Sequence, residues 1–181
     1  MKWSKSKKAL ENLLADAVKK RVRFHMTRYG PGVSETMTRA WVTWDKKELV
    51  NMSNVEWLIE SYALQHQIRE LNHCTDYRDP QQREGYYLAY QEAQDIVQKR
   101  GTLSRFQFEE AVEEYLGLSV ENAMDSANPI IKALCMFDKR LGKRRLPGIS
   151  LSQTEHPLVK LFYRLRCEAE GLAEVGDQNT P

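Results

Sequence analysis

A dense group of cations occupies residues 139–145. Its charged members are Lys139, Arg140, Lys143, Arg144 and Arg145. Arginine guanidiniums bind phosphate oxygens in pairs, and a cluster of like charges gains energy when a partner neutralises it. The segment is therefore a candidate site for an anionic partner, which would be either a nucleic acid or an acidic protein surface.

A structural role for the same segment is the alternative. We expect it at the C-terminal end of a helix, where cations complement the helix dipole and Gly142 suits the terminal position. Acidic residues could also fold over the cations and neutralise them in exposed salt bridges, each of which contributes little to stability. The carboxylates available for this are Glu109, Glu110, Glu113 and Glu114.

The charges of the chain are segregated along its length, although the net charge is only +2. Residues 1–30 carry nine basic and two acidic side chains, and residues 129–166 also carry nine and two. Between them, residues 81–128 carry four basic and nine acidic side chains. No RNA-recognition, zinc-finger or phosphate-loop motif accompanies the basic segments, so nucleic-acid or phosphate binding is the second hypothesis rather than the first.

Catalytic and metal-binding patterns are missing from the sequence. Cys74 follows His73, but adjacency along the chain does not bring two side chains into hydrogen-bonding contact, and no nucleophile with its base can be named. Cys74, Cys135 and Cys167 are odd in number and lack the paired spacing of zinc ligands. We therefore expect free thiols, no metal, no cofactor and no catalytic residues.

Two tryptophans mark a second candidate surface. Trp41 and Trp44 lie three positions apart in a segment that alternates like a strand, so their side chains should point to opposite faces of the sheet. One ring would then lie on the outer face, where tryptophan is favoured as a contact residue for a protein partner. Packing in the core is the alternative for both.

The first half of the chain should contain a helix and then a small sheet. Apolar residues at intervals of three and four predict an amphipathic helix over 4–20. Alternation from Val22 predicts a strand that ends at Gly30-Pro31-Gly32, and Thr38–Trp44 and Glu48–Met52 predict two more strands around a tight turn. Together they form a three-stranded antiparallel meander.

The second half should be mostly helical. Ser53 with Glu56 predicts the start of a helix that ends near Leu71, and Asp79-Pro80 predicts the start of the next, which ends before Gly101. Further helices are predicted to start after Ser104, Ser119 and Asn128, and the last should begin at Pro157. The predicted fold is α+β, with residues 1–172 as one compact unit, a sub-boundary near 72–79 and a flexible tail over 173–181.

Composition favours a soluble globular protein. The chain has 181 residues, of which 41% are hydrophobic and 29% are charged, as is usual for such proteins. No apolar run approaches the roughly 18 residues of a membrane span, and the charged N-terminal stretch is unlike a signal peptide. We expect a cytoplasmic location and no membrane partner.

Several short stretches, taken together, resemble a family of small bacterial cytoplasmic proteins with no assigned activity. The resemblance rests on Trp3-Ser4-Lys5, Asp45-Lys46-Lys47-Glu48, Asn51-Met52, the run from Asp138 to Arg144, and His156-Pro157 with Phe162-Tyr163. It implies a single folding unit and supplies no catalytic residue. The expected function is a non-enzymatic protein-interaction module, with nucleic-acid or phosphate binding by residues 139–145 as the alternative and an enzyme of unidentified class as the third hypothesis.

Overall fold

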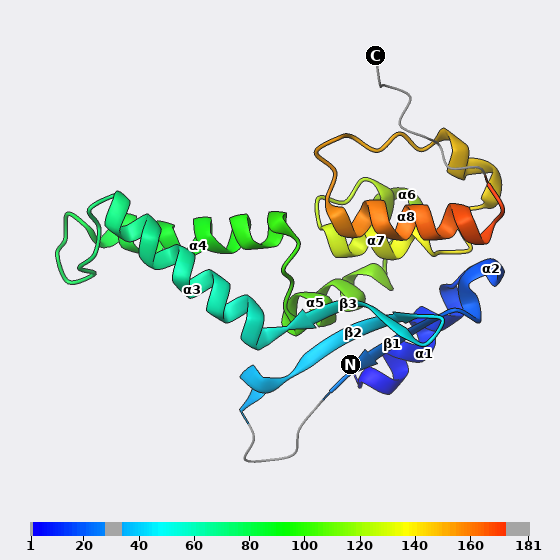
Figure 1. Ribbon diagram of the computed structural model, residues 1–181, viewed down its shortest axis with the longest axis horizontal. Coiled ribbons are helices and arrows are strands. Elements are labelled where there is room, and N and C mark those ends of the chain that lie inside the picture. The colour runs from blue at the N-terminus through cyan, green and yellow to red at the C-terminus, as the bar shows by residue number, and fades with distance from the viewer. Residues whose placement is uncertain (1, 28–33, 173–181) are drawn as a thin grey trace.

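A three-stranded antiparallel sheet follows a helical N-terminal region and precedes a series of helices (Figure 1). The computed structural model describes residues 2–27 and 34–172. The order of elements confirms the α+β prediction. The Gly30-Pro31-Gly32 turn and the tail predicted over 173–181 lie outside the described residues.

The N-terminal helical region is interrupted, so the prediction of one helix over 4–20 is wrong. Helix α1 covers Trp3–Leu13 and helix α2 covers Asp16–Lys19. Between them the chain is extended, and the Ala15 N–H donates to the Phe137 carbonyl at 2.9 Å. Because this distant segment satisfies the backbone groups at the break, a continuous helix is not needed.

The sheet has the order β1-β2-β3, with β1 at Val22–Met26, β2 at Arg39–Trp44 and β3 at Lys47–Ser53. A 3-10 turn, η1, precedes β2 at Glu35–Met37. Asp45 and Lys46 join β2 to β3 with φ of 49° and 69°. Two left-handed residues make the tight turn that matches strand twist, so the predicted meander is confirmed.

One face of the sheet forms the main core with α5 (Arg105–Tyr115), α7 (Pro129–Met136) and α8 (Pro157–Ala169). The sheet contributes alternate side chains, which is why the pattern of period two was visible in the sequence. These buried sheet residues are Val22, Phe24, Ala40, Val42, Trp44 and Met52. Phe137 links the layers and stacks on Phe162 with ring centroids 4.3 Å apart.

Side-chain caps start the helices of the second half where the sequence predicted them. Ser104 and Gln107 form a reciprocal capping box before α5. Ser119 caps α6, which covers Val120–Met124, and Asn128 caps α7. Each cap satisfies backbone N–H groups that the first turn of a helix leaves without partners.

Two long helices form an arm that projects from the body (Figure 1). They are α3, Asn54–Leu71, and α4, Arg83–Arg100, which pack as an antiparallel hairpin with residues 72–82 at its tip. Ser53 caps α3 as predicted, and Gly101, with φ of 107°, ends α4. The polar segment that suggested a sub-boundary is thus part of the connection between two packed helices.

The predicted start of the second arm helix is wrong. The Asp79 carboxylate accepts from the Gln81 N–H at 2.9 Å within the turn that precedes the helix, and α4 begins only at Arg83. Asp followed by Pro is also a common turn signal. The Asp79-Pro80 dipeptide is therefore compatible with either a helix start or a turn, and in the structure it forms the turn.

Candidate functional site

The basic segment lies in a turn and a 3-10 helix, so the prediction that it ends an α-helix is wrong. Helix α7 ends at Met136, and Gly142 precedes the 3-10 helix η2, Lys143–Gly148, as its N-cap. The segment therefore gains nothing from the dipole of α7 through a helix-terminal position. Its geometry depends instead on two buried polar groups.

The first of these groups is Asp138, whose side chain is fully buried. Its carboxylate accepts from the Arg140 backbone N–H at 2.7 Å, from the Arg140 Nε and Nη2 at 2.9 and 2.7 Å, and from the Tyr115 hydroxyl. Burial, with this carboxylate beside it, raises the pKa of Tyr115, and the hydrogen-bonded carboxylate raises the pKa of Arg140. Arg140 also donates to the Leu118 carbonyl at 2.8 Å, so its guanidinium is part of the folded framework.

The second group is Arg166 of α8, which is 2% exposed. Its guanidinium donates to the backbone carbonyls of Asp138 at 3.1 Å and Leu141 at 3.3 Å, and it pairs with Glu170 at 3.0 Å. A buried charge needs this degree of hydrogen bonding to be tolerated. Hydrogen bonds accepted by Asp138 and donated by Arg166 therefore fix the conformation of the chain between α7 and η2.

Carboxylates neutralise three of the five cations of the basic segment. Arg140 pairs with Asp138, Arg145 with Glu121 at 3.0 Å, and Lys143 with Glu170 at 3.9 Å. Lys139 and Arg144 are exposed and make no ion pair with the described residues. Among the acidic residues that could have covered the segment, Glu109 pairs with Arg105, and Glu110, Glu113 and Glu114 are exposed.

The two tryptophans of β2 lie on opposite faces of the sheet, as alternation requires. Trp44 is buried, with its ring 5.8 Å from that of Phe137. Trp41 is half-buried on the outer face, stacked on His25 at 4.9 Å and on the Arg39 guanidinium at 4.4 Å. Trp41 is the one of the pair that a partner could reach, but its neighbours already cover part of the ring.

The three thiols are buried, and His25 lies on the sheet beside Thr43. Cys74, Cys135 and Cys167 are buried as thiols, and burial raises the pKa of Cys135 to about 12. Burial also lowers the pKa of His25, whose Nε2 lies 3.2 Å from the Thr43 hydroxyl. Within the described parts of the chain, no three His, Cys, Asp or Glu side chains are placed to hold a metal ion.

The most unusual surface belongs to the arm. Of the ten large hydrophobic residues that are exposed in the described chain, eight lie on α3, α4 or the tip between them. They are Val55, Ile59, Tyr62, Leu71, Tyr77, Tyr87, Leu88 and Tyr90. The spacing of Val55, Ile59 and Tyr62 places them on one side of a helix but does not show whether another element covers that side, so this surface was not predicted from the sequence.

Five of these residues share one side of the hairpin, which we call the aromatic face: Val55, Ile59 and Tyr62 of α3 with Tyr87 and Tyr90 of α4. Arg69, two turns from Tyr62 on the same side of α3, donates to the Tyr86 carbonyl at 3.1 Å and lies 3.2 Å from its ring centroid. Tyr86 and Tyr90 are four residues apart on α4 and therefore adjacent. From this contact and the helical spacing we infer that the sides of α3 and α4 that carry these residues face the same way.

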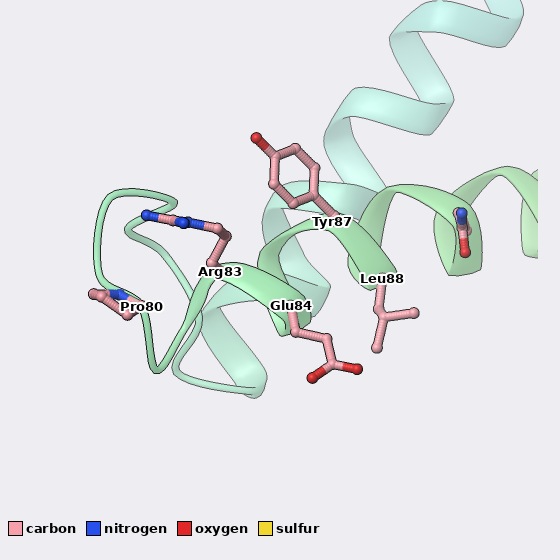
Figure 2. A pocket seen from close by; sticks show the side chains of 6 residues that line it. Pro80, Arg83, Glu84, Tyr87 and Leu88 are labelled. Carbon is pink, nitrogen blue, oxygen red and sulfur yellow. The ribbon is translucent and has the colours of Figure 1, made fainter.

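An open hollow of about 410 Å³ adjoins the aromatic face near the tip of the arm. Figure 2 shows its labelled lining residues Pro80, Arg83, Glu84, Tyr87 and Leu88, with Tyr87 and Leu88 leaving α4 in different directions. A shallow surface of this kind suits a protein side chain better than an enclosed small ligand.

The protein-family comparison matches residues 2–167, which include the body, the arm and the basic segment. The chain belongs to the SF0329 protein family. Comparisons with curated proteins and with solved structures found no match. The match covers most of the chain, as the resemblance seen in the sequence implied, and leaves the choice of function to the geometry of the chain.

In the SF0329 chain, none of the described helices is long and apolar enough to cross a membrane. The exposed hydrophobic side chains of the arm are interspersed with Glu56, Glu60, Glu84 and Glu92. The arm is thus an amphipathic hairpin with an apolar side, which is a form suited to packing against other helices.

Proposed function

We propose that this protein is a non-enzymatic protein-interaction module of the bacterial cytoplasm and that the aromatic face of the arm is its contact surface. The observation that carries the proposal is the concentration of eight exposed large hydrophobic residues on α3, α4 and their connection. Five of the eight form the aromatic face, and exposed apolar patches of this kind mark contact sites, because leaving such area in water is unfavourable.

The composition of the face supports a protein partner. Tyrosine is enriched among the residues that dominate binding energy, because its ring offers a large apolar area and its hydroxyl can stay hydrated or find a partner. The arm projects from the body (Figure 1), and the side chains of the aromatic face are exposed. A flat, accessible row of aromatic side chains fits a protein surface.

The buried polar groups of the body support the non-enzymatic part of the proposal. Asp138 is surrounded by donors from Arg140 and Tyr115, so its oxygens are occupied by structural hydrogen bonds. The raised pKa of Cys135 keeps that thiol protonated, and a protonated thiol is a poor nucleophile.

Site-specific photo-crosslinking in cells tests the proposal. A photo-reactive amino acid in place of Tyr62 should yield discrete protein adducts, and the same substitution at exposed Gln153 in the body serves as the matched control. Adding Ile59→Glu should suppress the adducts formed from position 62. Equal labelling from both positions, or none from position 62, would contradict the proposal.

The basic segment supports a second candidate function, which is nucleic-acid or phosphate binding through exposed Lys139, Lys143, Arg144 and Arg145. Changing Lys139 and Arg144 to Gln removes two cations that make no ion pair with the described residues. Titration of RNA and DNA at a series of salt concentrations should then show weaker binding. The slope of the logarithm of the binding constant against the logarithm of the salt concentration should become shallower by the contribution of about two phosphate contacts. An unchanged slope would exclude this site.

A further inference from the structure

We infer that the occupant of the aromatic face is a second copy of this chain, so that two arms pack face to face as a four-helix bundle. The inference rests on the proposed function, because it names the partner of the same surface.

Helix α3 buries polar side chains and exposes large apolar ones, although Ile68 and Leu64 also face inward. Ser61, Gln65 and Ile68 share the side of α3 that faces α4, and Ser61 and Gln65 are only 3% and 6% exposed. Ile59 and Tyr62 of the same helix remain in solvent. A helix normally turns its apolar side to the core, so the outer side of α3 is built like an interior surface.

The interior of the arm is also small. The buried hydrophobic residues of α3 and α4 are Ile68, Ala89, Ala93 and Val97, with Leu64 and Ile96 partly buried and packed beside Ile68 and the two alanines. The arm helices have 18 residues each and project from the body. Helical stability in proteins comes mainly from packing of an apolar side, and units of this size are usually supported by association. A second hairpin on the aromatic face would supply the missing layer.

The exposed side chains of the aromatic face supply most of the area that a specific dimer needs. Tyr62, Tyr87 and Tyr90 are 61%, 57% and 43% exposed, and Ile59 is 64% exposed. A tyrosine buries about 200 Å² when it is covered, so the three rings offer about 300 Å² and the whole aromatic face about 450 Å². Two copies would bury about 900 Å² from these side chains, and the polar side chains around them bring the total towards the roughly 1,200 Å² of a specific interface.

The aromatic face is compatible with a two-fold interface. Such an interface requires a surface that is complementary to itself, and the five side chains that define the face bring no like charges together. The five side chains of the aromatic face, Val55, Ile59, Tyr62, Tyr87 and Tyr90, are all uncharged. Each 18-residue helix is about 27 Å long, which is a usual length for the helices of a four-helix bundle.

The experiment is sedimentation velocity of the full-length protein over a dilution series in the micromolar range. We expect a reversible dimer. Ile59→Glu should give a monomer with an unchanged far-ultraviolet circular dichroism spectrum, and the milder Ile59→Ala should weaken the dimer by at least about tenfold. Leu71→Glu is the matched control, because Leu71 is exposed on the same helix about 180° round from Tyr62, and it should remain dimeric.

Two results would overturn the inference. One is a protein that stays monomeric over the whole concentration range, and the other is equal dissociation of the Ile59→Ala and Leu71→Glu variants. If the purified protein is monomeric while a photo-reactive group at position 62 captures a different protein in cells, the second-copy inference fails and the proposed function stands. If neither a dimer nor an adduct forms, both fail. The Ile59→Ala variant keeps the test decisive if Ile59→Glu does not fold.

Discussion

Replacement of Asp138 by Asn should destabilise the protein strongly, because it breaks the buried hydrogen-bond network beneath the basic segment. The Asp138 carboxylate accepts from Tyr115 and from three N–H groups of Arg140. Asn has nearly the same shape, but its amide nitrogen is a donor, and the guanidinium of Arg140 cannot accept a hydrogen bond. At least one contact with Arg140 is therefore lost, together with the negative charge.

The magnitude follows from the surroundings of each partner. Removing one member of a fully buried ion pair costs about 3–5 kcal/mol. The side chain of Arg140 is 31% exposed, whereas that of Asp138 is 0% exposed, so water can partly replace the lost carboxylate and the expected cost falls to about 2–4 kcal/mol. Tyr115→Phe removes a single hydroxyl from a carboxylate that keeps its Arg140 donors, so it should cost only about 1–2 kcal/mol.

Urea unfolding followed by tryptophan fluorescence measures both changes. The urea concentration at the midpoint of unfolding should fall in both variants, while the dependence of the unfolding free energy on urea concentration stays constant. This combination indicates a change in stability and not in the unfolded state. The double variant should lose less than the sum of the single losses, because the two side chains share one network. An Asp138→Asn cost below about 1 kcal/mol, or a larger cost for Tyr115→Phe, would refute the reasoning.

Three further predictions concern the body. Leu14→Ala should lower the free energy of unfolding by about 2–5 kcal/mol, and half-buried Leu13→Ala should lower it less, as measured by urea unfolding; equal losses would contradict the packing of the break between α1 and α2. Arg140→Gln should lower the melting temperature, whereas exposed Arg144→Gln should change the free energy of unfolding by no more than about 0.5 kcal/mol. Burial lowers the pKa of His25 below 6.5, so the stability it contributes is present above about pH 6.5 and is lost as pH falls towards its folded pKa. His25→Gln should reduce the loss of stability between about pH 7 and pH 5, and an unchanged pH dependence would argue against this role.

The local features of the fold were legible in the sequence because neighbouring residues determine them. Ser53, Ser104 and Asn128 cap helices by hydrogen bonds that reach only two or three residues along the chain. Alternation in β2 and the turn at Asp45 likewise depend on nearby residues. Such signals predicted the order of the elements and most of their boundaries.

The tertiary structure decided the features that depend on residues far apart in the sequence. The break after α1 forms because Ala15 finds a backbone partner in Phe137, and no local pattern could reveal that partner. Arg140 is a structural residue because Asp138 and Leu118 meet it in space. Its chemistry alone predicted an exposed cation.

The aromatic face is the clearest division between the two kinds of information. Spacing along the sequence shows that Val55, Ile59 and Tyr62 share one side of a helix. It does not show whether another element covers that side, because coverage depends on how the hairpin packs on itself and on the body. The structure turns Ser61 and Gln65 inward and leaves Ile59 and Tyr62 exposed, so the surface becomes visible only when the helices are placed together.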